Sequence, residues 1–150
     1  MKKKEHNLSI LSQYIKDLSF ENINSLSQAG ALEEQPQIDV QVKVDIQKGD
    51  NPNVYFISLI TEINAKLNKP LFILELTYTG EFLVEGFPDD IINLILYVEC
   101  PRLLFPFVRC IIANVATDGG FPPLYLSPLN FMEMYMQQME ANKASSPGNE

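Results

Sequence analysis

The sequence contains few of the side chains that form enzyme active sites and metal centres. One of its 150 residues is histidine and two are cysteine. The histidine, His6, lies in a polar N-terminal stretch that we expect to be unfolded, so a catalytic triad would lack a base in a fixed position. A structural zinc ion needs four clustered nitrogen or sulfur ligands, and Cys100, Cys110 and His6 do not supply them. We expect no catalytic residues, no metal ion and no cofactor.

Positive charge and long apolar runs are also scarce. The formal net charge of -8 would be repelled by nucleic acid and by an anionic membrane, whereas a basic partner would be attracted. The nearest candidate for a membrane helix, residues 91–98, is cut short by Pro101 and Arg102, below the roughly 18 apolar residues that such a helix requires. The opening MKKKEHN has lysines but no apolar run after them, unlike a signal peptide. We expect a soluble cytoplasmic protein.

The composition predicts a single folded domain with flexible ends. With 46% hydrophobic and 20% charged residues, the chain is long enough to bury one core. We expect residues 1–13 to be a flexible N-terminal segment, residues 14–140 to form the domain, and residues 141–150, ANKASSPGNE, to be a flexible C-terminal tail. Cys100 and Cys110 lie in apolar sequence, where we expect buried, reduced thiols.

Strand patterns occupy the first half of the predicted domain. Residues 38–46, IDVQVKVDI, alternate between apolar and polar and predict a half-buried antiparallel strand. After a turn at GDNP, residues 54–65 are rich in β-branched and aromatic side chains, and the early part, VYFISLI, is apolar on both faces. A third strand, LFILELTYT, is expected at residues 71–79. Gly80 is expected to form a bulge or turn before a further strand, EFLVEG.

Helix patterns occupy the second half. The acidic pair at residues 89–90, after a proline, predicts a helix start. Pro101 is expected to break or kink this helix, which then continues over residues 103–117 until the glycines at 119–120 end it. Because the strands precede the helices instead of alternating with them, we expect an α+β domain with helices on one face of an antiparallel sheet.

A last helix is predicted to begin near Asn130. The side chain of Asn130 can cap the helix, and Glu133, three residues later, completes a capping-box-like pair. One apolar stripe with spacings of three and four consists of Phe131, Met134, Tyr135 and Gln138.

The sequence has more apolar surface than one thin sheet-and-helix domain can bury. The surplus comes from the two-sided strand VYFISLI, from the aromatic-proline segment at residues 119–135, GGFPPLYLSPLNFMEMY, and from a methionine-rich last helix. Methionine is unbranched and polarizable, so it adapts to varied apolar ligands. The surplus predicts that the protein forms an oligomer or binds apolar partners.

Three motifs, in the same order along the chain, resemble those of the SecB family of bacterial preprotein-export chaperones. Residues 119–131, GGFPPLYLSPLNF, resemble the C-terminal signature of the family, and residues 14–22, YIKDLSFEN, resemble its N-terminal strand motif. Residues 100–112, CPRLLFPFVRCII, resemble its Cys-Pro-x-x-Leu-Phe-Pro-Tyr-Ala-Arg helix. The departures from this helix motif are local and lie at Phe107, Val108 and Cys110.

The resemblance implies both an assembly and an activity. The implied fold is a four-stranded antiparallel sheet with helices packed on one face, assembled as a dimer of dimers into a homotetramer. The implied activity is that of an ATP-independent holdase, which keeps secretory precursors unfolded and delivers them to the SecA motor ATPase for export through the Sec translocon. A holdase binds the unfolded state and opposes folding by mass action, and several grooves on one tetramer add avidity.

The resemblance also implies two candidate surfaces. In the family, the acidic outer face of the sheet meets the basic, zinc-carrying tail of SecA. The resemblance assigns this face here to Asp17, Glu21, Ile73 and Glu75. The client-binding groove is less well fixed by the motifs, and each of its candidates also fits an ordinary core or subunit-interface position. We assign the groove to the aromatic-proline segment and the last helix, at Phe121, Tyr125, Leu126, Phe131 and Tyr135.

Other functions stay open at this point. A SecB-like chaperone dedicated to an antitoxin or another single client would share all three motifs. A small oligomeric α+β enzyme with an apolar pocket, and an adaptor with one folded partner, are more remote alternatives.

Overall fold

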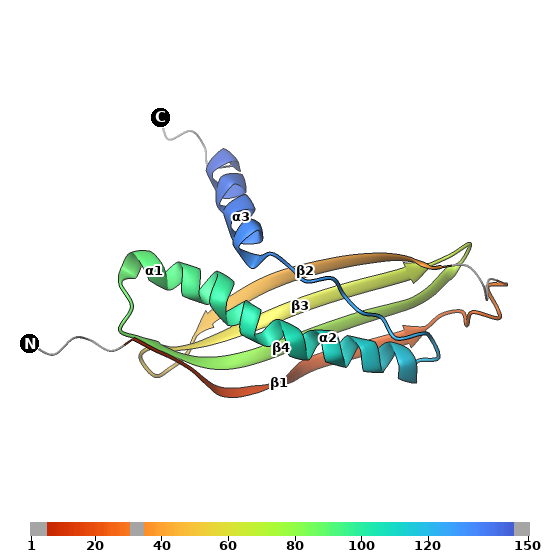
Figure 1. Cartoon of the computed structure of the whole chain (residues 1–150), viewed down its shortest axis with the longest axis horizontal. Coiled ribbons are helices and arrows are strands. Elements are labelled where there is room, and N and C mark those ends of the chain that lie inside the picture. The colour runs from red at the N-terminus through yellow and green to blue at the C-terminus, as the bar shows by residue number, and fades with distance from the viewer. Residues whose placement is uncertain (1–5, 31–34, 146–150) are drawn as a thin grey trace, which may run out of the picture.

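A four-stranded antiparallel sheet forms the centre of the computed structural model, which describes residues 6–30 and 35–145 (Figure 1). The strands lie in the order β1-β4-β3-β2. A long helix made of α1, η1 and α2 runs along one face of the sheet, and α3 rises from the side where β2 lies (Figure 1). The elements are β1 (Asn7–Asn22), β2 (Gln37–Lys48), β3 (Val54–Lys66), β4 (Pro70–Glu85), α1 (Asp89–Leu94), the π-helical η1 (Ile95–Glu99), α2 (Cys100–Asp118) and α3 (Phe131–Ser145).

The expected fold class is confirmed, because strands precede helices and the helices pack on one face of an antiparallel sheet. The alternation in β2 places its apolar side chains on the helix-covered face, where all except Val40 are half-buried. In β3 the inner side chains from Ile57 to Ala65 are buried, and early in the strand both faces are largely covered, as the VYFISLI pattern predicts.

The strand β4 differs from its prediction because it does not turn at Gly80. Its residues from Phe72 to Glu85 pair with β1, whose register shifts between Ile10 and Ser12 and between Ile15 and Asp17, and Gly80 lies opposite Ile57 of β3. Gly80 faces α2, and a Cβ atom there would lie 2.8 Å from Leu104 Cδ2 and 2.6 Å from Phe82 Cε2. The glycine therefore permits a close approach of the helix to the sheet, and the fourth strand of the sheet is β1.

Both ends of the domain extend further than predicted. The strand β1 begins at Asn7, inside the segment expected to be flexible, because β4 continues to Glu85 and offers it a pairing partner. The Asn7 Nδ2 donates a hydrogen bond to Glu85 Oε1 at 3.3 Å, and the ring of His6 stacks on Phe87 with centroids 4.9 Å apart. At the other end, α3 continues through Ser145. Residues 1–5 and 146–150 lie outside the described residues.

Pro101 does not break the long helix. The turn before it is a π-helix in which the backbone N–H of Cys100 donates to the carbonyl of Ile95, five residues earlier. A proline lacks the N–H for an ordinary helical bond and crowds the carbonyl four residues before it, so a wider turn at this point accommodates it. By length and composition alone the Asp89–Asp118 helix could cross a membrane. Its buried side of Leu104, Val108 and Ile112 packs on the sheet, however, as in a core helix.

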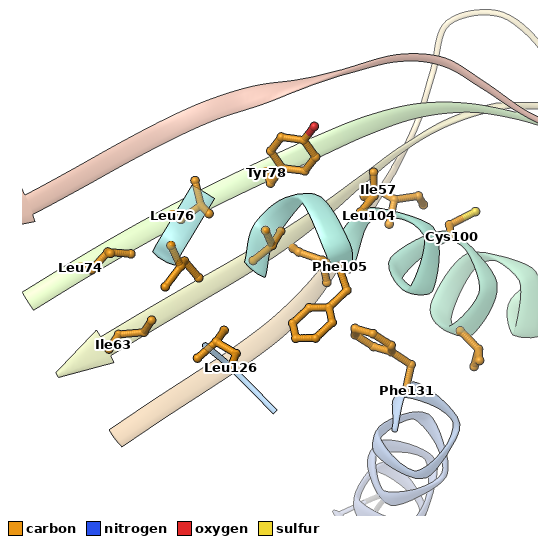
Figure 2. Packing of buried hydrophobic residues seen from close by; sticks show 14 of the residues in the cluster. Ile57, Ile63, Leu74, Leu76, Tyr78, Cys100, Leu104, Phe105, Leu126 and Phe131 are labelled. Carbon is orange, nitrogen blue, oxygen red and sulfur yellow. The ribbon is translucent and has the colours of Figure 1, made fainter. Parts of the chain in front are cut away.

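The main core lies between α2 and the central strands β3 and β4 (Figure 2). The segment after α2 is extended, as its prolines predict, and crosses to α3. Its first aromatic side chain, Phe121, is buried against Phe72 and Phe20, with ring centroids 4.8 and 6.3 Å away. The predicted cap of α3 is confirmed, because Asn130 Oδ1 accepts a hydrogen bond from the backbone N–H of Glu133 at 3.0 Å.

We predict that Gly80→Ala destabilises the protein by about 1–3 kcal/mol, since the new methyl group would displace Leu104 and Phe82. Leu104→Ala alone should cost about 2–5 kcal/mol through the cavity that it leaves. The double variant should lose less than the sum of the two, because the added methyl group fills part of that cavity. Urea unfolding of the three variants measures these differences, and strict additivity would contradict the close helix-to-sheet contact at Gly80.

Candidate functional site

A groove with both apolar and polar lining side chains lies between β2 and α3, on the helix-covered side of the sheet. It is a cavity of about 550 Å³, half open to solvent. Two half-buried valines of β2 line the groove, together with one tyrosine from η1 and the first turns of α3. The lining residues are Val42, Lys43, Val44, Tyr97, Phe131, Met134, Tyr135, Gln137 and Gln138.

The groove exists because α2 does not extend over β2. The helix packs on β3 and β4, the two central strands. The inner side chains of β2 are therefore only half-covered, and Val40 is exposed although it points to the same face as Val42 and Val44. Apolar side chains on an edge strand with an open face are available to a ligand.

Two aromatic contacts fix α3 beside the groove. The rings of Tyr97 and Tyr135 stack, with centroids 5.4 Å apart. Phe131, which is 2% exposed, meets Phe105 of α2 edge to face at 5.8 Å, as Figure 2 shows at the start of α3. A second cavity of about 170 Å³ shares Tyr97, Tyr135 and Gln138 with the first and continues along α3. The groove is thus a pair of adjoining hollows with an aromatic wall between them.

The structure brings together two of the five side chains that we assigned to the groove from the sequence. Phe131 and Tyr135 line it. Phe121 and Leu126 are buried in the core, and Tyr125, which is 72% exposed, lies in a separate hollow beside Arg109 and Cys110. The separation arises because side chains along an extended segment point in different directions.

Seven of the nine lining residues were not assigned to the groove from the sequence, among them Val42, Val44 and Tyr97. The alternation of β2 does mark the two valines as facing the helices, but whether a helix covers them depends on where α2 lies. Tyr97 reaches the groove from the π-helical turn, which the pattern of apolar residues did not predict.

The four residues of the predicted acidic face do lie on one face of the sheet, opposite α2. Glu21 lies directly across from Ile73, and Asp17 lies across from Thr77, so these β1 and β4 side chains share a face. Glu75 is two residues from Ile73 on that same face. The three acidic side chains are exposed and Ile73 is half-buried.

A further carboxylate, Glu62 of β3, lies directly opposite Glu75. The neighbours of this pair in the same row of the sheet are Gln41 and Ser19, neither of which is positively charged. In the described parts of the chain none of these acids forms an ion pair. Like charges directly across a sheet repel each other and destabilise it. Because no cation lies in this row of four residues, the electrostatic potential there stays negative. The sequence alone did not identify Glu62 because strand register was needed to place it.

The two cysteines lie in different environments. Cys100 is buried, as expected, and burial, with a smaller effect of the nearby Glu99 charge, raises the pKa of its thiol to about 12. Cys110 is exposed on α2, so the expectation of burial is wrong for it. Within residues 6–30 and 35–145, no three His, Cys, Asp or Glu side chains gather to hold a metal ion.

A second apolar surface lies on the other side of α2, along the edge strand β1. Ile15 lies across from Tyr78, whose ring stacks on Phe107 of α2 with centroids 6.2 Å apart. We call these exposed residues the β1–α2 patch. They are Ile10, Leu11, Ile15, Leu18, Leu103 and Phe107. Tyr14 is also exposed, but it lies across from Thr79 on the face opposite α2. An exposed apolar edge of this length is a surface for pairing with another chain.

Comparison with known proteins identifies a family. The sequence model of the family described as "Preprotein translocase subunit SecB" matches residues 1–142. Curated relatives named "Protein-export protein SecB" include that of Ruegeria sp. (strain TM1040), which is 41% identical over 93% of this chain and 87% of the relative. The relative from Zymomonas mobilis is 46% identical over 89% and 80%, and that from Paracoccus denitrificans is 43% identical over 88% and 76%.

Among solved structures, a SecB-like chaperone of Mycobacterium tuberculosis in complex with a peptide from an antitoxin superposes with a TM-score of 0.68. The match covers 81% of this chain and 90% of that chain at 10% sequence identity. At this identity the similarity establishes the fold.

Proposed function

Since this chain belongs to the SecB family of protein-export chaperones, we propose that it holds secretory precursors unfolded in the bacterial cytoplasm without ATP and delivers them to the SecA motor ATPase. The observation that carries the proposal is the half-open groove between β2 and α3, which is lined by apolar and aromatic side chains together with Lys43 and two glutamines. The export names of relatives at about 40% identity favour precursors over a single dedicated client.

The chemistry of the groove suits a client without a defined shape. Val42 and Val44 give a flat apolar floor, while Tyr97, Met134 and Tyr135 form a wall with adaptable side chains. Beside the floor, β2 is the outer strand of the sheet and has a free backbone edge, which an extended client can pair with whatever its sequence.

A single groove should bind a client segment only weakly. Burying one large apolar client side chain contributes about 1.5–3 kcal/mol. After the entropy cost of ordering the client, two or three such side chains give weak binding. Several grooves on one assembly, engaged by one long unfolded chain, multiply weak contacts into avidity, while a folded client offers no extended apolar segments. Preference for the unfolded state delays folding by mass action.

We predict that substoichiometric protein, counted as tetramer, delays refolding of an unfolded precursor without nucleotide. Val44→Asp should weaken binding of a permanently unfolded polypeptide by about tenfold or more, because it places a charge on the groove floor. Gln47→Asp is the matched control, since it adds the same charge to the same strand on the opposite, exposed face. Unchanged refolding with the wild-type protein, or equal effects of both variants, would contradict the assignment.

We further propose that Asp17, Glu21, Ile73 and Glu75 bind the basic tail of SecA. The support is geometric and electrostatic: the four residues share one face, and the acids around Glu75 form no ion pair among the described residues. Contacts between exposed charges are screened by salt, so this binding should fall as ionic strength rises.

Glu75→Lys should therefore weaken SecA binding and flatten its salt dependence, with client binding and assembly unchanged. Asp50→Lys makes the same change of charge in the exposed turn between β2 and β3 and should have a much smaller effect. Titration of SecA at several salt concentrations measures both. Equal affinity of wild type and Glu75→Lys at low salt would exclude Glu75 from the contact.

We propose that the β1–α2 patch joins protomers into the homotetramer. Native mass spectrometry should give an assembly of about four times the 17.0 kDa mass of one chain. Ile15→Asp should shift the mass to smaller species, because it buries a charge in an apolar interface. Ser19→Asp, on the exposed outer face of the same strand, should leave the mass unchanged. A wild-type protein that stays monomeric at micromolar concentration would contradict this assembly.

A further inference from the structure

The internal methionines of this chain are concentrated in one helix. Four of its five methionines lie in α3, within an eight-residue window. They are Met132, Met134, Met136 and Met139. No other part of the chain between Met1 and this helix contains a methionine.

The four side chains lie at or beside the groove. Met134 lines the main groove, and Met139 lines the adjoining cavity of about 170 Å³. Met132 and Met136 lie on the open surface of α3, together with Glu133, Gln137 and Glu140. Three of the four are well exposed, at 38% for Met132, 57% for Met136 and 51% for Met139. Their thioether sulfurs are therefore accessible both to an apolar ligand and to a dissolved oxidant.

We propose that oxidation of the α3 methionines to sulfoxides is a reversible switch that lowers the affinity of the groove for unfolded clients. The oxidant is a peroxide or hypochlorous acid. With hydrogen peroxide, a sulfur lone pair attacks one peroxide oxygen, the O–O bond breaks, an S–O bond forms and water leaves. The sulfur loses two electrons and the peroxide gains them, so one oxygen is added for each peroxide consumed.

The sulfoxide changes the surface that the client meets. A thioether is apolar and flexible, whereas a sulfoxide is polar and loses hydration when an apolar segment covers it. Methionine sulfoxide is restored to methionine by methionine sulfoxide reductases, which makes the change reversible. The inference rests on the proposed function, because it requires that clients bind at α3.

The attachment of α3 to the domain should survive this oxidation. The helix is held by buried Phe131 against Phe105, by the stack of Tyr97 on Tyr135, and by the cap at Asn130. None of these contacts uses a methionine sulfur, and of the four methionines Met134 is the one that also packs against the core. The expected effect is therefore a loss of client affinity without loss of the fold.

The test compares reduced and peroxide-treated wild-type protein, with a fluorescently labelled, permanently unfolded polypeptide as the probe. Mass spectrometry of peptides verifies one added oxygen at each α3 methionine. We expect the dissociation constant to rise about tenfold, from several new polar groups on the binding surface. Circular dichroism and thermal unfolding should stay close to those of the reduced protein. Treatment with a methionine sulfoxide reductase should restore the affinity.

The matched control carries Met132→Leu, Met134→Leu, Met136→Leu and Met139→Leu. Leucine keeps the apolar volume and is not oxidised, so this variant should bind before and after peroxide with equal affinity. It also retains the exposed Cys110, and dithiothreitol reverses thiol oxidation but not sulfoxide formation.

The outcomes separate the inference from the proposed function. If reduced wild-type protein does not bind the polypeptide, the proposed function fails and the switch fails with it. If the protein binds but keeps its affinity with all four sulfoxides formed, only the switch is overturned. An equal loss of affinity in the leucine variant would likewise assign the effect to another residue and overturn the switch.

Discussion

The packing of α2 on the centre of the sheet decides where apolar surface stays open. An α-helix is about 10 Å wide, whereas the outer strands of a four-stranded sheet lie about 15 Å apart. One helix therefore covers β3 and β4. Because Gly80 has no side chain, the helix can pack close to these strands. The inner faces of β1 and β2 remain only partly covered. The open strip at β2 becomes the groove with α3, and the strip at β1 becomes the β1–α2 patch.

Local chemistry made much of the fold predictable. The alternation of β2, the cap at Asn130 and the extended proline segment each depend on residues close in sequence, and each is found in the structure. The errors concern contacts between distant segments. Gly80 was interpreted as a bulge or turn because its role is to admit Leu104 of α2, which comes 24 residues later. The start of β1 was missed because a polar segment becomes a strand when β4 offers it an edge.

The same distinction applies to the two candidate surfaces. The acidic face could be predicted because strand alternation and motif positions fix which face a residue shares, although the register that adds Glu62 could not. The groove could be predicted only in part. Its α3 side follows from the stripe that contains Phe131 and Tyr135, whereas its floor at Val44 depends on the width of α2 and on the place where the chain crosses the sheet. Such features belong to tertiary packing and leave no local pattern.

The opposite placement of the two surfaces constrains any transfer of a client. The floor of the groove and the acidic face lie on the two sides of one sheet. Under the proposed assignments, a motor at the acids leaves the groove floor uncovered, so motor and client can bind together and release needs a separate decrease in groove affinity. The floor is built into a continuous ladder of backbone hydrogen bonds, which is costly to distort. The other wall, α3, is held mainly by aromatic contacts near its start. A change in the position or polarity of α3 is therefore the least costly way to weaken client binding.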